Sequence, residues 1–266
     1  MSLHAHRVVA VRYGELATTR SDVYLNYSDY GEADGPSALS YYFWVISGEY
    51  GTVVLDTGFS ATVGQRRGRT LLVDPLRAFD ALGVPDDPDT LVVLSHAHYD
   101  HIGNLDRFRR ATFLMAHSEY DYWVTAPHPL AITHRVVERT EIAALRTLHE
   151  AGRLKLISGS QEIGPGIRIE PAPGHTPGQL MLLVDTAQGR VLLTSDAVHT
   201  DEELARRMPF RHMCDLPAAA ISYDRIDELV RDHDVRLVVV GHEPSLTGRF
   251  PSDPRLPEHS LVLSDH

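Results

Sequence analysis

Short apolar runs recur along the whole chain, each rich in Val, Ile and aromatic residues and bounded by Gly, Asp or Pro. Runs of this kind predict β-strands. The predicted strands cover residues 6–13, 41–47, 52–56, 91–95, 112–116, 154–157, 167–170, 180–184, 191–195 and 237–240. The polar, Gly-containing segment 185–190 between two of them predicts a hairpin turn.

Apolar residues spaced three or four apart predict helices at 75–82, 135–151 and 217–233. The predicted strands come in hairpin-like groups and do not alternate regularly with helices, which indicates two mixed sheets with helices outside them. No repeat, low-complexity tract or long linker divides the chain. We therefore expect a single α/β domain that spans residues 1–266.

Composition and charge exclude several classes of protein. The 266 residues are 43% hydrophobic and 23% charged, as in an ordinary globular chain. A total of 25 Lys and Arg against 36 Asp and Glu leaves a formal charge of −11, which would repel a phosphate backbone and argues against nucleic-acid binding. Because no apolar run approaches 18 residues and no signal peptide is recognisable, we expect a soluble, cytoplasmic protein without a membrane segment.

The 16 histidines suggest metal binding or proton transfer, because they are clustered, whereas the single Cys214 excludes a disulfide framework and a Cys-rich zinc module. The densest cluster is Ser-His-Ala-His-Tyr-Asp-His, directly after a predicted strand. Alternate side chains of an extended segment share a face, so His96 and His98 can bind one cation, and Asp100 and His101 can face a second. A polar loop that happens to contain these residues would place costly unpaired polar groups behind a buried strand.

Single candidate ligands stand at the ends of other predicted strands, where loops hold functional groups on a rigid scaffold. His175 lies in a Gly-His-Thr-Pro-Gly turn, Asp196 ends a strand, and His242 follows a strand in a Gly-His-Glu-Pro segment. Each is a weak signal by itself, since a strand-end Asp is more often a helix N-cap than a ligand. Together with the histidine cluster they indicate one shared site.

The order of these motifs, from residue 56 to residue 242, resembles the metallo-β-lactamase superfamily. The resemblance implies an αββα sandwich of two mixed β-sheets flanked by helices, with a dinuclear site at one edge of the sheets. It also suggests that Asp56, in an Asp-Thr-Gly turn, supports a ligand, although a plain turn explains this motif equally well. The implied ligands are His96, His98 and His175 for the first metal, Asp100, His101 and His242 for the second, and Asp196 as the bridge between them.

The ligand set predicts the cofactor and the type of reaction. Five imidazoles and two carboxylates suit two Zn²⁺ ions, although Mn, Fe or Co would also fit. Two cations held close together lower the pKa of a shared water, so that a hydroxide is available at neutral pH to attack a carbonyl or phosphoryl centre. We therefore expect a hydrolase that acts on a small molecule.

Within the superfamily, the chain is similar to the N-acyl homoserine lactonase group in length and in the order of its Asp-Thr-Gly, His-x-His-x-Asp-His, Gly-His-Thr-Pro-Gly, strand-end Asp and Gly-His-(Asp/Glu)-Pro elements. Typical β-lactamases have a Cys at the second metal, where this chain has Asp100. The similarity implies opening of a lactone ring, with quorum quenching as the role, by a metal-bridging hydroxide. Asp100, Asp196 and His199 are then the catalytic residues. His199 stands where those lactonases commonly have a Tyr, and an imidazole N–H could hold the lactone carbonyl in the same way.

Several questions stay open at the level of the sequence. A neutral cyclic ester is the expected substrate, with a cyclic amide, carbamate, thioester or phosphotriester as alternatives. A catalytically silent metal-binding module and a homodimer are also compatible with the sequence. His199 could instead be a surface residue before a helix at 201–207.

Two further segments have two interpretations each. The arginine-rich segment 64–70 could bind an anion, but a solvated loop is the expected state. Two groups of large side chains could wall an acyl-chain pocket, although ordinary core packing is the simpler expectation for both. These groups are Tyr120, Tyr122 and Trp123, and Met208, Phe210 and Met213.

Overall fold

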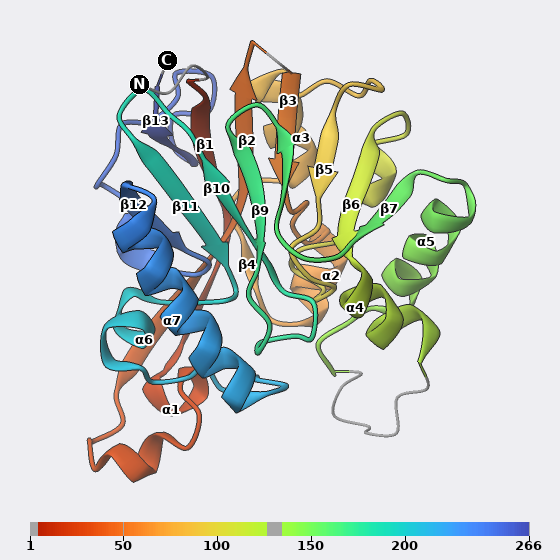
Figure 1. The fold of residues 1–266 in the computed structure, drawn as a ribbon. Coiled ribbons are helices and arrows are strands. Elements are labelled where there is room, and N and C mark those ends of the chain that lie inside the picture. Colours follow the sequence, from red (N-terminus) through yellow and green to blue (C-terminus); the bar gives the residue numbers. More distant parts are fainter. Residues whose placement is uncertain (1–4, 50, 127–134, 266) are drawn as a thin grey trace.

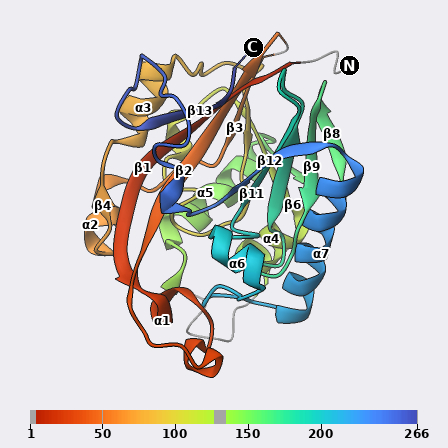
Figure 2. The same cartoon turned by 90° about the vertical axis from the view of Figure 1, so that its left-hand side faces the viewer.

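The computed structural model describes residues 5–49, 51–126 and 135–265. Over these ranges two β-sheets pack face to face, with helices on both outer sides, and Figure 2 shows these layers from the side. The predicted αββα sandwich is therefore confirmed. No helix in the described ranges is long and apolar enough to cross a membrane.

The first sheet has eight strands in the order β13-β1-β2-β3-β5-β6-β7, with β4 paired to β1. Strands β3, β5, β6 and β7 are mutually parallel, and the other pairs are antiparallel. The strands are β1 (Arg7–Thr19), β2 (Pro36–Gly48), β3 (Gly51–Leu55), β4 (Thr70–Leu71), β5 (Leu91–Val93), β6 (Thr112–Ala116), β7 (Leu154–Ile157) and β13 (Ser260–Ser264).

The second sheet has five strands in the order β12-β11-β10-β9-β8. Its β11–β12 pair is parallel and its other pairs are antiparallel, so the sheet is mixed, as expected. The strands are β8 (Gln161–Gly164), β9 (Ile167–Pro171), β10 (Leu180–Val184), β11 (Arg190–Ser195) and β12 (Val235–Val240).

Successive side chains of a strand point to opposite faces of its sheet, and this divides the core into layers. In β2, Trp44 and Ile46 pack between the two sheets, while their neighbours Phe43 and Val45 face the outer helices. A strand that is buried on both faces reads as an almost continuous apolar run, which is why the sequence located it. One strand therefore contributes side chains both to the core between the sheets and to the core under the outer helices.

Helices cover both outer faces of the sandwich (Figure 1). α3 (Pro75–Leu82) and α5 (Arg139–Glu150) pack on the first sheet, and α7 (Leu216–Asp232) packs on the second. The remaining helices are short, and several of them lie next to loops that follow strand ends. They are α1 (Arg20–Val23), α2 (Ala61–Arg66), α4 (His117–Tyr120) and α6 (Asp201–Arg206), with short 3₁₀ or π segments at Tyr27–Tyr30, Leu105–Arg107, Asp121–Thr125 and Pro244–Leu246.

The structure corrects several boundaries. β1 and β2 continue beyond 6–13 and 41–47 as a long hairpin arm, whose outer ends are too polar to form an apolar run. The helix predicted at 135–151 begins only at Arg139. Residues 64–70 are largely exposed, as expected, but they are not one loop, because they end α2 and begin β4. Strands β4, β8 and β13 were not predicted.

Glu141 in α5 provides a prediction about stability. The residue is only 8% exposed, and its Oε2 has no hydrogen-bond partner among the described residues. Burial, followed by the nearby charge of Glu138, raises the pKa of Glu141 from 4.5 to about 8. The folded protein then keeps a proton that the unfolded chain releases above pH 4.5, so the free energy of unfolding falls as the pH rises from about 4.5 to about 8.

Glu141→Gln should remove this loss, because the amide has no proton to release. We expect the variant to be more stable than the parent by about 4 kcal/mol at pH 8, with little difference near pH 4.5. Thermal unfolding measured between pH 5 and pH 8 checks the result, and Glu150→Gln, at an exposed position of the same helix, is the matched control. A parent and variant that respond identically to pH would contradict the assignment.

Candidate dinuclear metal centre

The predicted ligands come from four loops that meet at one edge of the sandwich. The histidine cluster 95–101 follows β5, Asp196 follows β11 and His242 follows β12. His175 lies in the turn between β9 and β10. Because β5, β11 and β12 all end toward this edge, their following residues are brought together although up to 146 positions separate them in the chain.

Backbone contacts fix these loops to one another. The Leu180 N–H donates to the Ser95 carbonyl across the two sheets at 2.9 Å, and the His242 N–H donates to the His199 carbonyl at 2.8 Å. A Cβ atom at Gly241 would lie 2.6 Å from the Asp196 carboxylate, so only glycine allows the end of β12 to approach this closely. The separation between the loops is therefore set by backbone packing.

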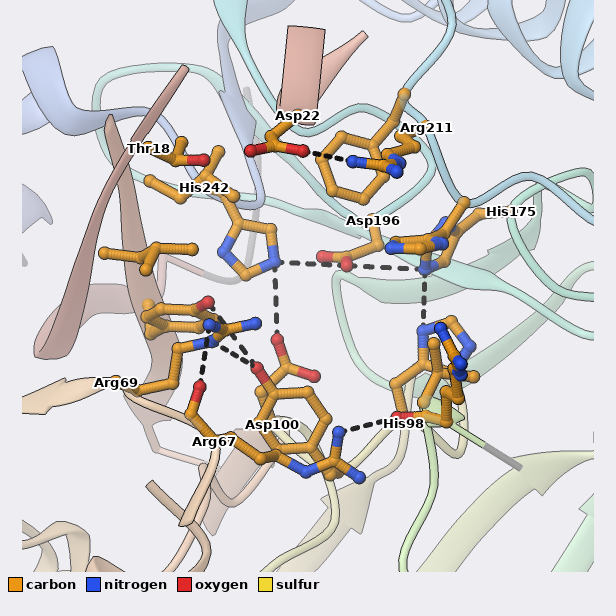
Figure 3. A pocket seen from close by; sticks show the side chains of 18 of the residues that line it. Thr18, Asp22, Arg67, Arg69, His98, Asp100, His175, Asp196, Arg211 and His242 are labelled. Atoms are coloured by element: carbon orange, nitrogen blue, oxygen red, sulfur yellow. Dashed lines mark hydrogen bonds and ion pairs between the residues drawn. The ribbon is translucent and has the colours of Figure 1, made fainter. Parts of the chain in front are cut away.

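Asp196 lies at the centre of the cluster, between the imidazoles on either side (Figure 3). Its Oδ2 is 3.1 Å from His242 Nε2 and 3.5 Å from His175 Nε2, and its Oδ1 is 3.4 Å from His101 Nε2. The residues form four groups, and within each group the possible donor atoms lie within 4.8 Å of one another. The groups are His96, His98 and His175; His96, His101 and Asp196; Asp100, His101 and His242; and His175, Asp196 and His199. All seven predicted ligands thus lie in one buried cluster, and Asp196 is shared between groups.

The cluster fits metal ions, because several buried donor atoms lack a hydrogen-bond partner within the described ranges. Such atoms cost free energy unless a ligand satisfies them. Burial lowers the pKa of His96, His98 and His175 well below its ordinary value, so these imidazoles keep a lone pair that can bind a cation. The unpartnered atoms are Nε2 of His96, His101 and His199, Nδ1 of His175 and Oδ1 of Asp196.

Asp56 orients one of the candidate ligands. Its Oδ2 lies 2.7 Å from Nδ1 of His101, and its Oδ1 accepts the Ser95 N–H at 2.8 Å. A carboxylate in this position selects the tautomer of the imidazole and increases its basicity toward a metal. Asp56 has a φ of 66°, and this unusual backbone directs the side chain into the cluster. The Asp-Thr-Gly segment is thus more than a plain turn.

Glu119 in α4 supports two of the candidate ligand loops, and sequence analysis missed this residue. Its Oε1 accepts the Ala97 N–H at 2.8 Å, between His96 and His98, and its Oε2 accepts the Gly178 N–H at 2.9 Å. The side chain is fully buried, and this burial raises the pKa of its carboxyl group. One carboxylate therefore joins the histidine cluster to the loop that carries His175.

His199 is fully buried, so the surface position considered from the sequence is wrong. Its Nδ1 lies 3.0 Å from Oε2 of Glu203, and its Nε2 lies 3.3 Å from Oδ2 of Asp196. The ring stacks on Phe210 with centroids 3.6 Å apart and 14° between the planes. Burial lowers the pKa of His199, but the charges of Glu203 and Asp196 outweigh it and raise the pKa to about 9. Nε2 thus faces the cluster from a fixed orientation.

Glu203 is a second residue that sequence analysis missed. Its Oε1 accepts both the Tyr223 hydroxyl at 2.7 Å and the Phe210 N–H at 3.2 Å. These contacts hold the carboxylate in place while it accepts the backbone N–H of His199 at 2.6 Å. The residue follows Asp201 and Glu202 at the start of α6, where acidic side chains are usually solvated, so its local sequence does not indicate burial.

A cavity of about 590 Å³ opens above the cluster. Phe210 lines it together with Leu16 and Leu39 of the hairpin arm, so one of the proposed wall residues has that position. Met208 packs in the small core beneath the arm. Tyr120 and Trp123 belong to the core beside α5, which is the simpler of the two expectations for the first aromatic group.

Comparisons with known proteins agree with this geometry. A family model described as the metallo-beta-lactamase superfamily matches residues 37–242. An N-acyl homoserine lactonase of Bacillus thuringiensis is 28% identical over 220 residues, covering 77% of this chain and 82% of the relative. An N-acyl homoserine lactonase of Rhizobium radiobacter is 28% identical over 181 residues, covering 65% of each chain.

Solved structures show the same fold. A quorum-quenching N-acyl homoserine lactone lactonase aligns with a TM-score of 0.73 at 21% identity, over 93% of this chain and 96% of the other. A dizinc quorum-quenching lactonase in complex with a product aligns with a TM-score of 0.68 at 19% identity, over 92% of both chains. The sandwich fold is therefore shared with proteins of known structure.

Proposed function

The chain belongs to the metallo-β-lactamase superfamily, and on that basis we propose that it is a dinuclear metal-dependent hydrolase that opens lactone rings. The observation that carries the proposal is the convergence of four loops on Asp196, whose carboxylate lies within 4 Å of five buried imidazoles. The relatives named N-acyl homoserine lactonase, and a neighbour solved with an N-acyl homoserine product, make this lactone class the first to test.

We assign two Zn²⁺ ions to the cluster, a choice that the nitrogen-rich donor set and a dizinc structural neighbour support. Bound cations supply Lewis acidity and lower the pKa of water, so that a nucleophile is available at neutral pH. Asp100 and Asp196 offset part of the positive charge. The assigned ligands are His96, His98 and His175 for one ion, Asp100, His101 and His242 for the other, and Asp196 between them.

His199 is the residue that we assign to the lactone carbonyl. Glu203 holds Nδ1 and Phe210 supports the ring face, so Nε2 is directed toward the cluster. In its protonated form the imidazole donates from Nε2 to the carbonyl oxygen as negative charge develops there. An alkoxide leaves more readily than an amide nitrogen, which requires a proton donor. We therefore expect lactones to react faster than lactams.

Metal content and substrate preference test the proposal together. We expect two metal ions per chain by elemental analysis after gentle purification, and loss of activity on chelation that added Zn²⁺ restores. A panel of lactones, lactams, thioesters and phosphotriesters should then show the highest kcat/KM for a lactone. A catalytically silent module would bind the metals and turn over no member of the panel.

Two results would contradict the proposal. The first is a reproducible content of one metal ion or fewer after reconstitution, which would exclude a dinuclear centre. The second is a lactam or phosphotriester that reacts faster than every lactone, which would assign the site to another reaction of this superfamily.

A further inference from the structure

Arginines line the cavity above the cluster, although the chain as a whole carries a charge of −11. Arg67, Arg69, Arg135 and Arg211 all border this cavity. Figure 3 shows Arg69 reaching into it on the same side as Asp100 and His242. Three carboxylates line it as well, but Asp22 pairs with Arg211, and Asp100 and Asp196 belong to the candidate metal centre. The positive charge that they leave unpaired attracts ligands of the opposite sign. The pocket therefore favours an anionic group that the rest of the surface would repel.

Two of these arginines already have carboxylate partners. Arg67 pairs with Glu138 at 2.8 Å, and its guanidinium lies 4.0 Å from the centroid of the Tyr99 ring. Arg211 forms an ion pair with Asp22. Their charges are compensated, so their main effect is to shape the cavity wall.

Arg69 is held differently. Its Nε donates to the Tyr99 hydroxyl at 2.9 Å, and its Nη1 donates to the Arg67 carbonyl at 2.9 Å. Its backbone N–H donates to the Gly64 carbonyl at 2.8 Å, so both the chain and the side chain are fixed. Within the described ranges Arg69 contacts no carboxylate at ion-pair distance, and its Nη2 donates no hydrogen bond. The guanidinium thus has a fixed position, and its Nη2 is available to a ligand.

Arg135 adds a second uncompensated charge at the same opening. Its carbonyl accepts from Arg67, which anchors its backbone at the cavity wall, while its exposed side chain has no ion pair with the described residues. Arginine presents a planar fork that matches the two oxygens of a carboxylate or phosphate. Arg69 and Arg135 together form the kind of site that binds such a group.

We propose that the substrate is a lactone that carries an acidic group, a carboxylate or a phosphate, and that Arg69 binds this group with Arg135 as a second cation. The proposal rests on the lactonase function above and names the class of lactone. The neutral cyclic ester expected from the sequence does not use the charge of Arg69. The arginine segment 64–70 is accordingly an anion-binding segment, the alternative that the sequence analysis ranked second.

Matched lactones test the proposal on the zinc-loaded protein. The ring and chain length stay constant, and the substituent ends in a carboxylate, in its methyl ester or in a phosphate monoester. We expect kcat/KM to be about tenfold to a hundredfold higher for one of the two acidic lactones than for the methyl ester, mostly through KM. The acidic lactone with the higher kcat/KM identifies the natural group. A preference for either the carboxylate or the phosphate supports the proposal.

Arg69→Gln should remove this preference, because it lowers kcat/KM for the acidic lactone far more than for the methyl ester, and the content of two metals should stay the same. Arg69→Lys should keep part of the preference, because an ammonium retains the charge without the fork. Arg66→Gln is the matched control, since this arginine belongs to the same segment, is exposed and does not line the cavity. It should behave as the parent protein does.

A binding measurement separates this proposal from the lactonase function. A cyclic ether with the same acidic substituent has no carbonyl to react, and calorimetry should show about tenfold weaker binding to Arg69→Gln than to the parent. If no lactone reacts but this difference is present, the anion site stands and the lactonase function fails. If lactones react but the acidic and neutral ones do so equally, or if Arg69→Gln slows both equally, the anion site is wrong and the lactonase function stands.

Discussion

Asp196→Ala is expected to lower kcat/KM by on the order of 1,000-fold and to reduce the metal content below two per chain. The reason is the central position of its carboxylate, which lies 3.1 Å from His242 Nε2 and 3.4 Å from His101 Nε2, on two sides of the cluster. Its carboxylate also lies 3.8 Å from His96 Nε2 and 3.5 Å from His175 Nε2. Replacing a single terminal ligand, as in His242→Ala, should reduce the rate less, since the remaining donors still hold one ion.

Elemental analysis and steady-state kinetics on the same preparation measure both effects. Asp201→Ala is the matched control, because it is the same substitution five residues later, at a partly exposed side chain that pairs with Arg249. Circular dichroism should show that both variants are folded. Retention of two metals with a near-normal rate in Asp196→Ala would show that another residue connects the two halves of the centre.

The second large effect is expected for His199→Ala, which should lower kcat by about 100-fold to 1,000-fold while the metal content stays near two. The imidazole is positioned rather than mobile, since Glu203 lies 3.0 Å from Nδ1 and Phe210 stacks on the ring. The variant removes a donor to the developing charge and leaves the seven assigned ligands in place. His199→Tyr should restore part of the rate, because a phenol can donate to the same oxygen.

Glu203→Gln tests whether His199 acts as a hydrogen-bond donor or only fills space. The amide keeps the shape of the side chain but loses the charge that favours a proton on His199, so kcat should fall by about tenfold, with the larger loss at higher pH. A role in packing alone would change stability and leave the pH profile unaltered. Unchanged lactone turnover in His199→Ala would exclude the carbonyl assignment, and a fall to one metal per chain would instead make His199 a ligand.

The candidate ligands could be predicted from the sequence, because each is attached to a local pattern. His96 and His98 directly follow a buried strand, and Asp196 and His242 directly follow two others. Strand ends are recognisable from a few neighbouring residues, and the two-residue period alone determines which side chains face the same way. The structure brings all of these residues into one buried cluster.

The residues that position the ligands could not be predicted in this way. Glu119 and Glu203 lie in short helices among polar neighbours, where a carboxylate is usually solvated, and only the packing of distant loops buries them. Arg69 likewise belongs to a segment with the composition of a loop. It borders the cavity because β4 pairs with the extended part of β1, at Gly14 and Leu71, which no apolar run indicated.

The sequence by itself thus determined the two sheets, the order of the metal-binding motifs and the identity of the candidate ligands, since hydrophobic periodicity and strand ends are local properties. Only the tertiary structure decided the burial of Glu119 and Glu203, the orientation of His199 and the uncompensated charge of Arg69. The physical reason is that burial and charge pairing depend on groups far apart in the chain. Glu138, for example, neutralises Arg67 from 71 positions away, while no described carboxylate reaches Arg69.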